Sequence, residues 1–234
     1  MGRLQRLVLL GAVVLIAIVA IAAIGARLLL GSHQSPSPFA LASGEHSGSV
    51  SALAGQWTTG SGSLVGYRAK EQFINQPSET EAVARTSSVK GTLVVAVEGG
   101  TVNVSKMKFT VDLASLTSQD KYATYQVYQR DFFVRTVYLE TTSFPTATFV
   151  ADSVKFPLPT DGEASVDVPG KLTVHGVTKA VTAHVQASST GSQAEVVGSM
   201  DVDMRDFAID PPDISFTRAE PGITIEFDLK LVHT

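Results

Sequence analysis

The chain has 234 residues, no cysteine and a formal net charge of -4 at pH 7. The lack of cysteine excludes a disulfide framework, a thiolate metal site and a lipid anchor attached through cysteine. The length fits one domain with a sizeable core, together with an appendage.

The appendage is residues 1–30, which predict a single membrane-spanning helix. The run from Leu7 to Ala26 contains no charged residue. At about 1.5 Å per residue it is long enough to cross a hydrocarbon core of about 30 Å. Arg3 and Arg6 precede the run, so the positive-inside rule favours a cytoplasmic N-terminus and an extracytoplasmic remainder. The alternative is a cleaved secretory signal, which would leave a secreted protein.

Residues 31–55 are rich in Ser, Gly, Pro and Ala and show no sustained period, a composition typical of a flexible linker. The globular domain is then expected at residues 56–234. The part of the chain beyond the predicted membrane anchor carries a net charge of about -7. This acidic balance argues against nucleic acid as a partner and against electrostatic docking on anionic lipid.

From Trp57 onward the sequence alternates with a period of two, as β-strands with one apolar face do. The clearest segment runs from Ile223 to Leu231, where the odd positions are apolar and the even positions face water. Two segments change parity, near Lys106 and after Ala151, which indicates a bulge or bend that lets a sheet curl. About eight hairpin-connected strands predict an all-β fold, an antiparallel up-and-down eight-stranded barrel, because closure removes exposed edges.

One helical insert interrupts this pattern. Aromatic residues recur there at spacings of three, three and four, on one face of a helix: Tyr122, Tyr125, Tyr128 and Phe132. Such a stripe is expected to be buried against the sheet. A compatible alternative is a helix that closes one mouth of a cavity. Arg130 and Asp131 are adjacent and cannot face each other, so each is expected to pair with another residue.

The residues that usually carry catalysis do not form a recognisable motif. There is no nucleophile elbow, phosphate-binding loop, dinucleotide fingerprint or zinc-protease motif. The five histidines are scattered, and none lies at ligand spacing from another. We therefore predict a protein that is not an enzyme, with no catalytic residues, metal site or cofactor.

An eight-stranded barrel can be filled by side chains or can hold one small ligand. Small residues at inward positions are expected to leave room: Ala69, Gly91, Ala147, Ala151, Ala183 and Gly198. The larger apolar positions predicted to line the cavity are Tyr67, Phe109, Val111, Phe149, Leu172, Val174, Met200, Val202, Ile225 and Phe227. A barrel filled by its own side chains is the alternative.

Several segments in a fixed order resemble one known family. They are GSLVGYRAKE and AVARTSSVKG near the start, RDFFVRTVYLETTSFPTATF at Arg130 to Phe149, GKLTVHGVTKAVT at Gly170 to Thr182, and MRDFAID at Met204 to Asp210. Together these motifs resemble the YceI-like family of bacterial polyisoprenoid-binding proteins, in the version found in actinobacterial members. The resemblance covers about Trp57 to Leu231.

The resemblance implies a lipocalin-like barrel that holds a long isoprenoid chain in an apolar cavity, without catalysis. Carried over residue by residue, it implies a polar rim of Arg130, Asp131, His175 and Arg205. An arginine there could meet a phosphate or carbonyl head group, whereas strand parity places His175 outside the lumen or at a rim turn. Ala208 stands where the family usually has glycine, which argues against a left-handed backbone at this position.

These features predict a membrane-tethered, extracytoplasmic protein that sequesters or transports a polyisoprenoid lipid, either a polyprenyl phosphate or an isoprenoid quinone. One alternative is an enzyme acting on a barrel-bound apolar substrate, which would need a titratable residue in the lumen. Another is a structural envelope protein with a filled barrel. The sequence leaves the head group, the chain length and the oligomeric state open.

Overall fold

The computed structural model describes residues 33–42, 53–74, 78–121, 127–160 and 162–234. The predicted membrane span at residues 7–26 lies outside these ranges, as do Tyr122 and Tyr125 of the predicted aromatic stripe. Within them, no helix combines the length and the apolar character that crossing a bilayer requires.

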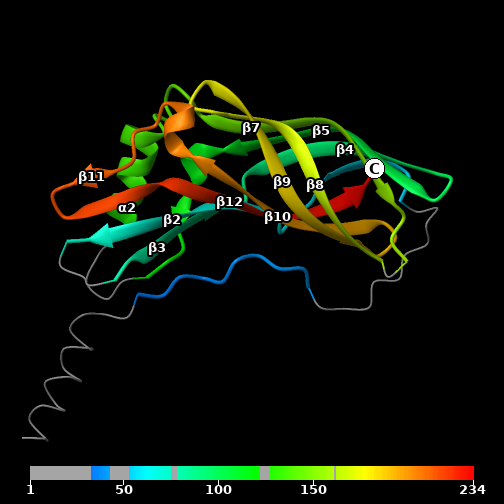
Figure 1. The fold of residues 1–234 in the computed structure, drawn as a ribbon, viewed down its shortest axis with the longest axis horizontal. Helices are drawn as coiled ribbons and strands as arrows, with labels where there is room; N and C mark the ends of the chain where they lie inside the picture. Colours follow the sequence, from blue (N-terminus) through cyan, green and yellow to red (C-terminus); the bar gives the residue numbers. More distant parts are fainter. Residues whose placement is uncertain (1–32, 43–52, 75–77, 122–126, 161) are drawn as a thin grey trace, which may run out of the picture.

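The described chain is built around antiparallel strands that close on themselves (Figure 1). The strands are β1 (Gly55–Thr59), β2 (Leu64–Phe73), β3 (Thr80–Thr86), β4 (Val89–Glu98), β5 (Thr101–Asp112), β6 (Thr117–Ser118), β7 (Thr146–Pro157), β8 (Glu163–Val174), β9 (Val177–Ser189), β10 (Gln193–Asp203), β11 (Asp213–Ile214) and β12 (Thr217–His233). Eight of them follow the order β1-β4-β5-β7-β8-β9-β10-β12, and β12 pairs back onto β1. The predicted eight-stranded up-and-down barrel is therefore confirmed.

The barrel is elongated because β12 is long enough to pair with two strands in turn. Near its C-terminus it pairs with β1, where Trp57 faces His233. Nearer its N-terminus it pairs with β2, where Tyr67 faces Ile225. Strand β3 pairs with β2 and leads through a short turn into β4. The β2–β3 pair thus extends the wall beyond the closed circuit at one end (Figure 1).

The predicted changes of parity are present where β4, β5 and β7 bend. The register of β4 against β5 shifts between Thr92 and Val94, and Lys106 on β5 has a φ of 52°. Val104 and Met107, on either side of Lys106, both face the interior. This bulge lets residues of opposite parity share one inner surface.

Buried apolar side chains fill the end of the barrel near the C-terminus. Trp57, Leu93 and Leu231 are each less than 9% exposed and belong to one apolar cluster. The ring of Trp57 packs edge-on against His233, with the ring centroids 5.2 Å apart. These bulky side chains close this end of the barrel.

Two of the small positions expected to leave room do not. Gly91 pairs with Phe109 and Gly198 with Phe227, and each phenyl ring covers its glycine. A Cβ added to Gly91 would lie 2.0 Å from Cδ1 of Phe109, and one added to Gly198 would lie 2.5 Å from Cζ of Phe227. The expectation was wrong for these glycines, because the facing ring fills the space. Ala151 does not line the cavity either, and the expected small positions that do are Ala69, Ala147 and Ala183.

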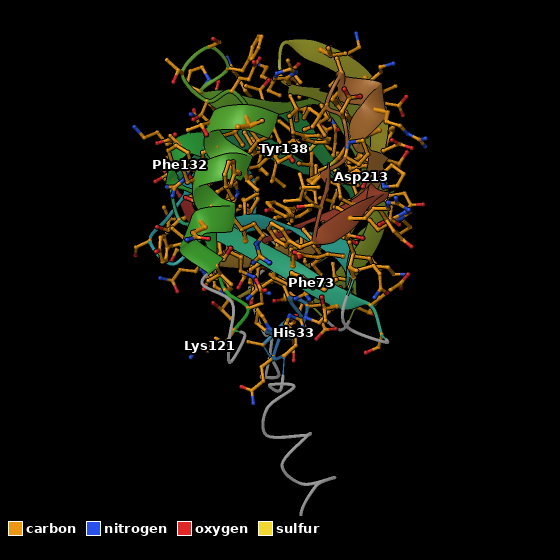
Figure 2. All side chains as sticks on the ribbon, turned by 90° about the vertical axis from the view of Figure 1, so that its left-hand side faces the viewer. His33, Phe73, Lys121, Phe132, Tyr138 and Asp213 are labelled. Atoms are coloured by element: carbon orange, nitrogen blue, oxygen red, sulfur yellow. The ribbon has the colours of Figure 1, made fainter. Side chains whose placement is uncertain are left out.

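The opposite end carries the helical insert. Helix α2 (Val127–Phe133) continues into a π-helical turn, η3 (Val134–Tyr138). Figure 2 looks at this end, with α2 on one side and β11 on the other. Tyr128 and Phe132 are 62% and 59% exposed, so the buried-stripe prediction is wrong for both. The helix instead turns its opposite face, with Arg130 and Val134, toward the interior.

Residues 33–42, which fall in the predicted linker, lie along the outer wall and are called the strap below (Figure 1). Arg68 donates a hydrogen bond to the carbonyl of Pro36 at 2.7 Å, and Arg85 donates one to that of Ser37 at 2.8 Å. Both arginines also bind Glu226, which is only 3% exposed. The even position of Glu226 predicted a solvent-facing side chain, but its arginine partners and the strap bury it.

Candidate functional site: the barrel cavity

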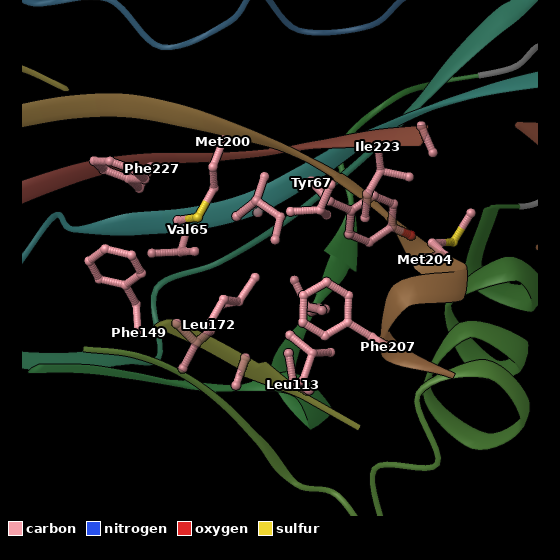
Figure 3. Close-up of a pocket in the computed structure, with 18 of the residues that line it drawn as sticks. Val65, Tyr67, Leu113, Phe149, Leu172, Met200, Met204, Phe207, Ile223 and Phe227 are labelled. Atoms are coloured by element: carbon pink, nitrogen blue, oxygen red, sulfur yellow. The ribbon is translucent and has the colours of Figure 1, made fainter. Parts of the chain in front are cut away.

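The barrel encloses a cavity of about 470 Å³, within the range typical of small-molecule sites. All ten larger apolar positions predicted from the sequence, from Tyr67 to Phe227, line it. Figure 3 shows five of them, Tyr67, Phe149, Leu172, Met200 and Phe227, pointing into the pocket from several strands. A barrel filled by its own side chains is contradicted by this cavity.

The cavity wall is apolar because the strands turn one parity inward. In Figure 3, Phe149 and Phe227 lie toward one end, and Tyr67 and Met204 lie toward the end that carries the helices. Leu172 and Met200 are 4% and 5% exposed. Such a wall offers contact to hydrocarbon and few hydrogen bonds.

A short 3-10 helix, η4 (Met204–Phe207), forms a part of the cavity wall that was not predicted from the sequence. Met204, Phe207 and Ile209 line the cavity, and Phe207 is only 3% exposed. The segment has no strand alternation, so parity could not place it. The three large apolar residues among the charged ones of MRDFAID were the available signal.

Among the described residues, the charged side chains that line the cavity are Glu71 and Arg130. Glu71 was missed, although it shares the odd parity of Tyr67 and Ala69 on the same strand. A titratable side chain therefore reaches the lumen, as the alternative of an enzyme acting on a barrel-bound substrate requires.

Arg130 is held by partners on several elements. Its Nη1 donates to Oε1 of Glu71 at 2.8 Å, and its Nη2 donates to Oγ of Ser118 at 2.7 Å and to Oδ1 of Asp120. Its Nε also donates to Ser118, at 3.2 Å. The neighbouring Asp131 accepts a hydrogen bond from the backbone N–H of Ser118 at 3.0 Å. The expectation that Arg130 and Asp131 each pair with another residue is confirmed: Arg130 binds Glu71 and Asp120, and Asp131 binds Ser118.

Two carboxylates therefore share one guanidinium. Burial raises the pKa of Glu71, the charge of Arg130 opposes that change, and the negative charge of Asp120 adds to it. Burial acts against the charged form of Arg130, but hydrogen bonding to Asp120 and the charge of Glu71 outweigh it and raise the pKa of Arg130. Burial also raises the pKa of Tyr67, so its hydroxyl keeps its proton. The cluster is a fixed cation with one carboxyl that resists ionisation.

The other residues of the predicted polar rim do not line the cavity. Asp131 turns to Ser118. His175, at the turn between β8 and β9, places Nε2 3.0 Å from Oε2 of Glu140, in agreement with the parity expectation. Arg205 is exposed and pairs with Asp203, whose pKa is lowered to about 2 by this hydrogen bond. Arg130 is thus the rim residue that reaches the cavity.

Thr217, which also lines the cavity, has a buried Oγ1 atom without a hydrogen-bond partner among the described residues. It lies on β12 two positions before Ala219, which pairs with Glu71 across the sheet. A buried hydroxyl without a partner costs free energy, which a rotation of this side chain toward a polar group in the cavity would recover. Within the same described residues, no group of three or more metal-ligating side chains comes together.

Ala208, at the end of η4, adopts φ 56° and ψ 35°. The substitution of alanine for the family's usual glycine argued against this left-handed conformation, so that expectation was wrong. The backbone N–H of Ala208 donates to the carbonyl of Arg205, and that of Ile209 donates to the carbonyl of Met204. These bonds hold the turn and place Ile209 against the cavity.

The closed meander and its apolar interior define a lipocalin-like barrel with a ligand-sized cavity. The model of the YceI-like domain matches residues 44–231, and the chain belongs to this family. The predicted family is therefore confirmed.

The chain is also similar to curated and solved relatives. It is 31% identical over 128 residues to a UPF0312 protein of Pseudomonas fluorescens, covering 52% of this chain and 62% of that protein. It is 29% identical over 126 residues to a UPF0312 protein of Pseudomonas putida, covering 51% and 61%. The match thus spans less than two thirds of these relatives. A polyisoprenoid binding domain from Saccharophagus degradans, implicated in plant cell wall breakdown, superposes with a TM-score of 0.55 at 13% identity, covering 77% of this chain and 99% of that one.

Proposed function

We propose that this protein binds a polyisoprenoid lipid in the barrel cavity and carries it in the extracytoplasmic space, tethered to the membrane by residues 7–26. The observation that carries the proposal is the 470 Å³ cavity with an almost wholly apolar wall. The name of the similar Saccharophagus degradans domain, a polyisoprenoid binding domain, points to the same ligand class.

The apolar wall supplies most of the affinity. Moving apolar surface out of water gains about 25 cal/mol per Å², or about 0.8 kcal/mol per buried methylene. A single isoprene unit of five carbons therefore contributes roughly 4 kcal/mol. A chain of several units needs no specific polar contact to bind tightly, and on this ground we propose lipid binding rather than catalysis as the function of the cavity.

The charged cluster favours an uncharged head group, so we propose a quinone-like lipid over a polyprenyl phosphate. Among the described residues, acceptors take four of the five N–H groups of the Arg130 guanidinium, so a phosphate that binds two of them must displace Glu71, Ser118 or Asp120. The carboxyl groups would also repel a phosphate. A quinone carbonyl needs only a neutral donor, and we infer that the Thr217 hydroxyl, which has no partner among the described residues, rotates into the cavity to supply it.

Competition between two lipids tests this proposal. The purified full chain is offered equal amounts of a menaquinone and a polyprenyl phosphate of matched chain length, and the retained lipid is identified by mass spectrometry. We expect the menaquinone to be retained preferentially, and Thr217→Val to reduce that preference. Preferential retention of the phosphate would overturn the head-group assignment, and retention of neither lipid would overturn the carrier function.

A further inference from the structure

The exposed apolar side chains gather at the helix-bearing end of the barrel. Among the described residues, eight large apolar side chains are more than two-fifths exposed, and one of them, Val150, lies on the wall strand β7. The other seven lie on two sides of this end and are called the mouth rim: Tyr128, Phe132, Phe133 and Val137 on α2 and η3, and Ile74, Ile214 and Phe216 on the facing side. Isolated exposed apolar residues are ordinary, but a contiguous set marks an interaction surface.

The mouth rim is continuous with the cavity. Phe133, Ile214 and Phe216 are each more than two-fifths exposed, and all three also line the cavity. The backbone N–H of Ile74 donates to the carbonyl of Phe216 at 3.1 Å, which joins the tip of β2 to the same surface. Figure 2 shows Phe132 on one side of this end, with Asp213 of β11 on the other. An apolar molecule can therefore pass between the rim and the cavity along apolar side chains.

Positive and negative charges balance beside the mouth rim: Arg135 of η3, which donates to the backbone carbonyls of Asp131 and Ala114, lies near the negative charge of Asp131, and two ion pairs lie on the other side. Arg218 donates to Asp213 at 3.2 Å, next to Ile214, and Lys70 lies 4.0 Å from Glu220. Such pairs leave little net charge to attract a charged partner. The rim fits an uncharged apolar partner.

The strap brings the predicted membrane anchor to this same end. Nε2 of His33 lies 3.5 Å from Oδ2 of Asp120, whose other oxygen binds Arg130 of α2. From there the strap runs along the barrel, and the N–H of Ala42 donates to Glu195 at 3.3 Å. The segment from Ala26 to His33 spans at most about 25 Å even when fully extended. A membrane span at residues 7–26 would therefore end within about 25 Å of His33, which contacts the mouth-rim end through Asp120.

We propose that the mouth rim inserts into the surface of the bilayer that holds residues 7–26, so that the cavity opens directly into the hydrocarbon. This inference rests on the proposed tether and lipid-carrier function, and it adds the orientation of the barrel and the route of the lipid. The isoprenoid enters between α2 and β11 without crossing water. Because the contact is apolar, it requires no anionic lipid.

Single-cysteine labelling tests the inference in the full chain, which has no cysteine of its own. Phe132→Cys and Ile214→Cys place an environment-sensitive fluorophore on the two sides of the mouth rim, and Val150→Cys places it on the barrel wall as the matched control. Each labelled chain is reconstituted into phosphatidylcholine vesicles with or without brominated acyl chains, which quench fluorophores that contact them. Lipid extracted from the same samples reports isoprenoid binding separately.

We expect brominated lipid to remove most of the fluorescence at Phe132→Cys and Ile214→Cys and to leave Val150→Cys unchanged, with the same result at high salt. If the chain floats with the vesicles and still yields isoprenoid while the two rim labels stay unquenched, rim insertion is overturned and the carrier function stands. The emission of the rim labels could instead report an apolar environment equally with and without bromine, and more strongly at higher protein concentration. That result would assign the rim to contact with a second copy of this chain. A chain that does not float with the vesicles would overturn both the tether and the inserted rim.

Discussion

Glu71 and Asp120 compete for the single guanidinium of Arg130. Burial raises the pKa of Glu71, the charge of Arg130 opposes that change, and the negative charge of Asp120 adds to it. A folded state that holds a proton more tightly than the unfolded state loses stability as that proton is released. Glu71 therefore contributes stability at low pH that disappears as the pH rises through its folded pKa.

Glu71→Gln should remove this pH dependence, because glutamine does not ionise and still accepts a hydrogen bond from Arg130. The free energy of unfolding of the wild type should fall relative to that of Glu71→Gln as the pH rises above 4.5, the ordinary pKa of glutamate. The slope should not exceed about 1.4 kcal/mol per pH unit. Chemical denaturation between about pH 4 and pH 8 measures the difference. If the wild type instead gains stability relative to Glu71→Gln as the pH rises, the pKa of Glu71 is lowered and the prediction is wrong.

Ala208 carries backbone strain that glycine would not. A left-handed conformation costs an ordinary residue about 1–2 kcal/mol, while glycine costs about 0.5–1 kcal/mol in chain entropy. Ala208→Gly should therefore raise the free energy of unfolding by about 0.5–1 kcal/mol, measured by chemical denaturation. Ala180→Gly, on the exposed face of β9, is the control and should lower it. Equal losses in both variants would mean that the turn at Ala208 is unstrained.

At the scale of elements, the strands could be predicted and the helix orientation could not. Alternation placed all ten larger lining residues, because each strand has one face in the barrel. The same alternation would have found Glu71. The face that α2 turns inward is decided by Arg130 binding Glu71, 59 residues away in the sequence, and no local period reports such a contact. The sequence predicted a flexible linker where the strap lies. The two arginines that hold the strap, Arg68 and Arg85, bind its backbone carbonyls, which no side-chain pattern of the strap reports.

The Gly91–Phe109 pair of β4 and β5 gives a prediction at this scale. A Cβ at position 91 would meet the phenyl ring at 2.0 Å, so Gly91→Ala must push the ring toward the cavity or move the strands apart. We expect a loss of about 1–3 kcal/mol in the free energy of unfolding. Gly222→Ala is the control, since a Cβ there meets no atom within 4 Å. A Gly91→Ala variant as stable as Gly222→Ala would mean that Phe109 is free to move.

At the scale of the whole molecule, the barrel is a container whose contents depend on free volume. Ala183 lines the cavity and is 2% exposed, whereas Ala180 on the same strand faces outward. Ala183→Phe should displace about one isoprene unit and weaken lipid binding about a hundredfold or more. Ala180→Phe should bind like the wild type. Titration with a menaquinone measures both, and unchanged binding by Ala183→Phe would place the lipid elsewhere.

The most direct test of the carrier function is native mass spectrometry of the full chain purified from bacterial membranes, followed by extraction of its lipid. We predict a one-to-one complex whose added mass is that of an isoprenoid lipid, and an extract that contains the same compound. A folded chain that stays empty, even when offered menaquinones and polyprenyl phosphates, would contradict the proposal that this cavity holds an isoprenoid.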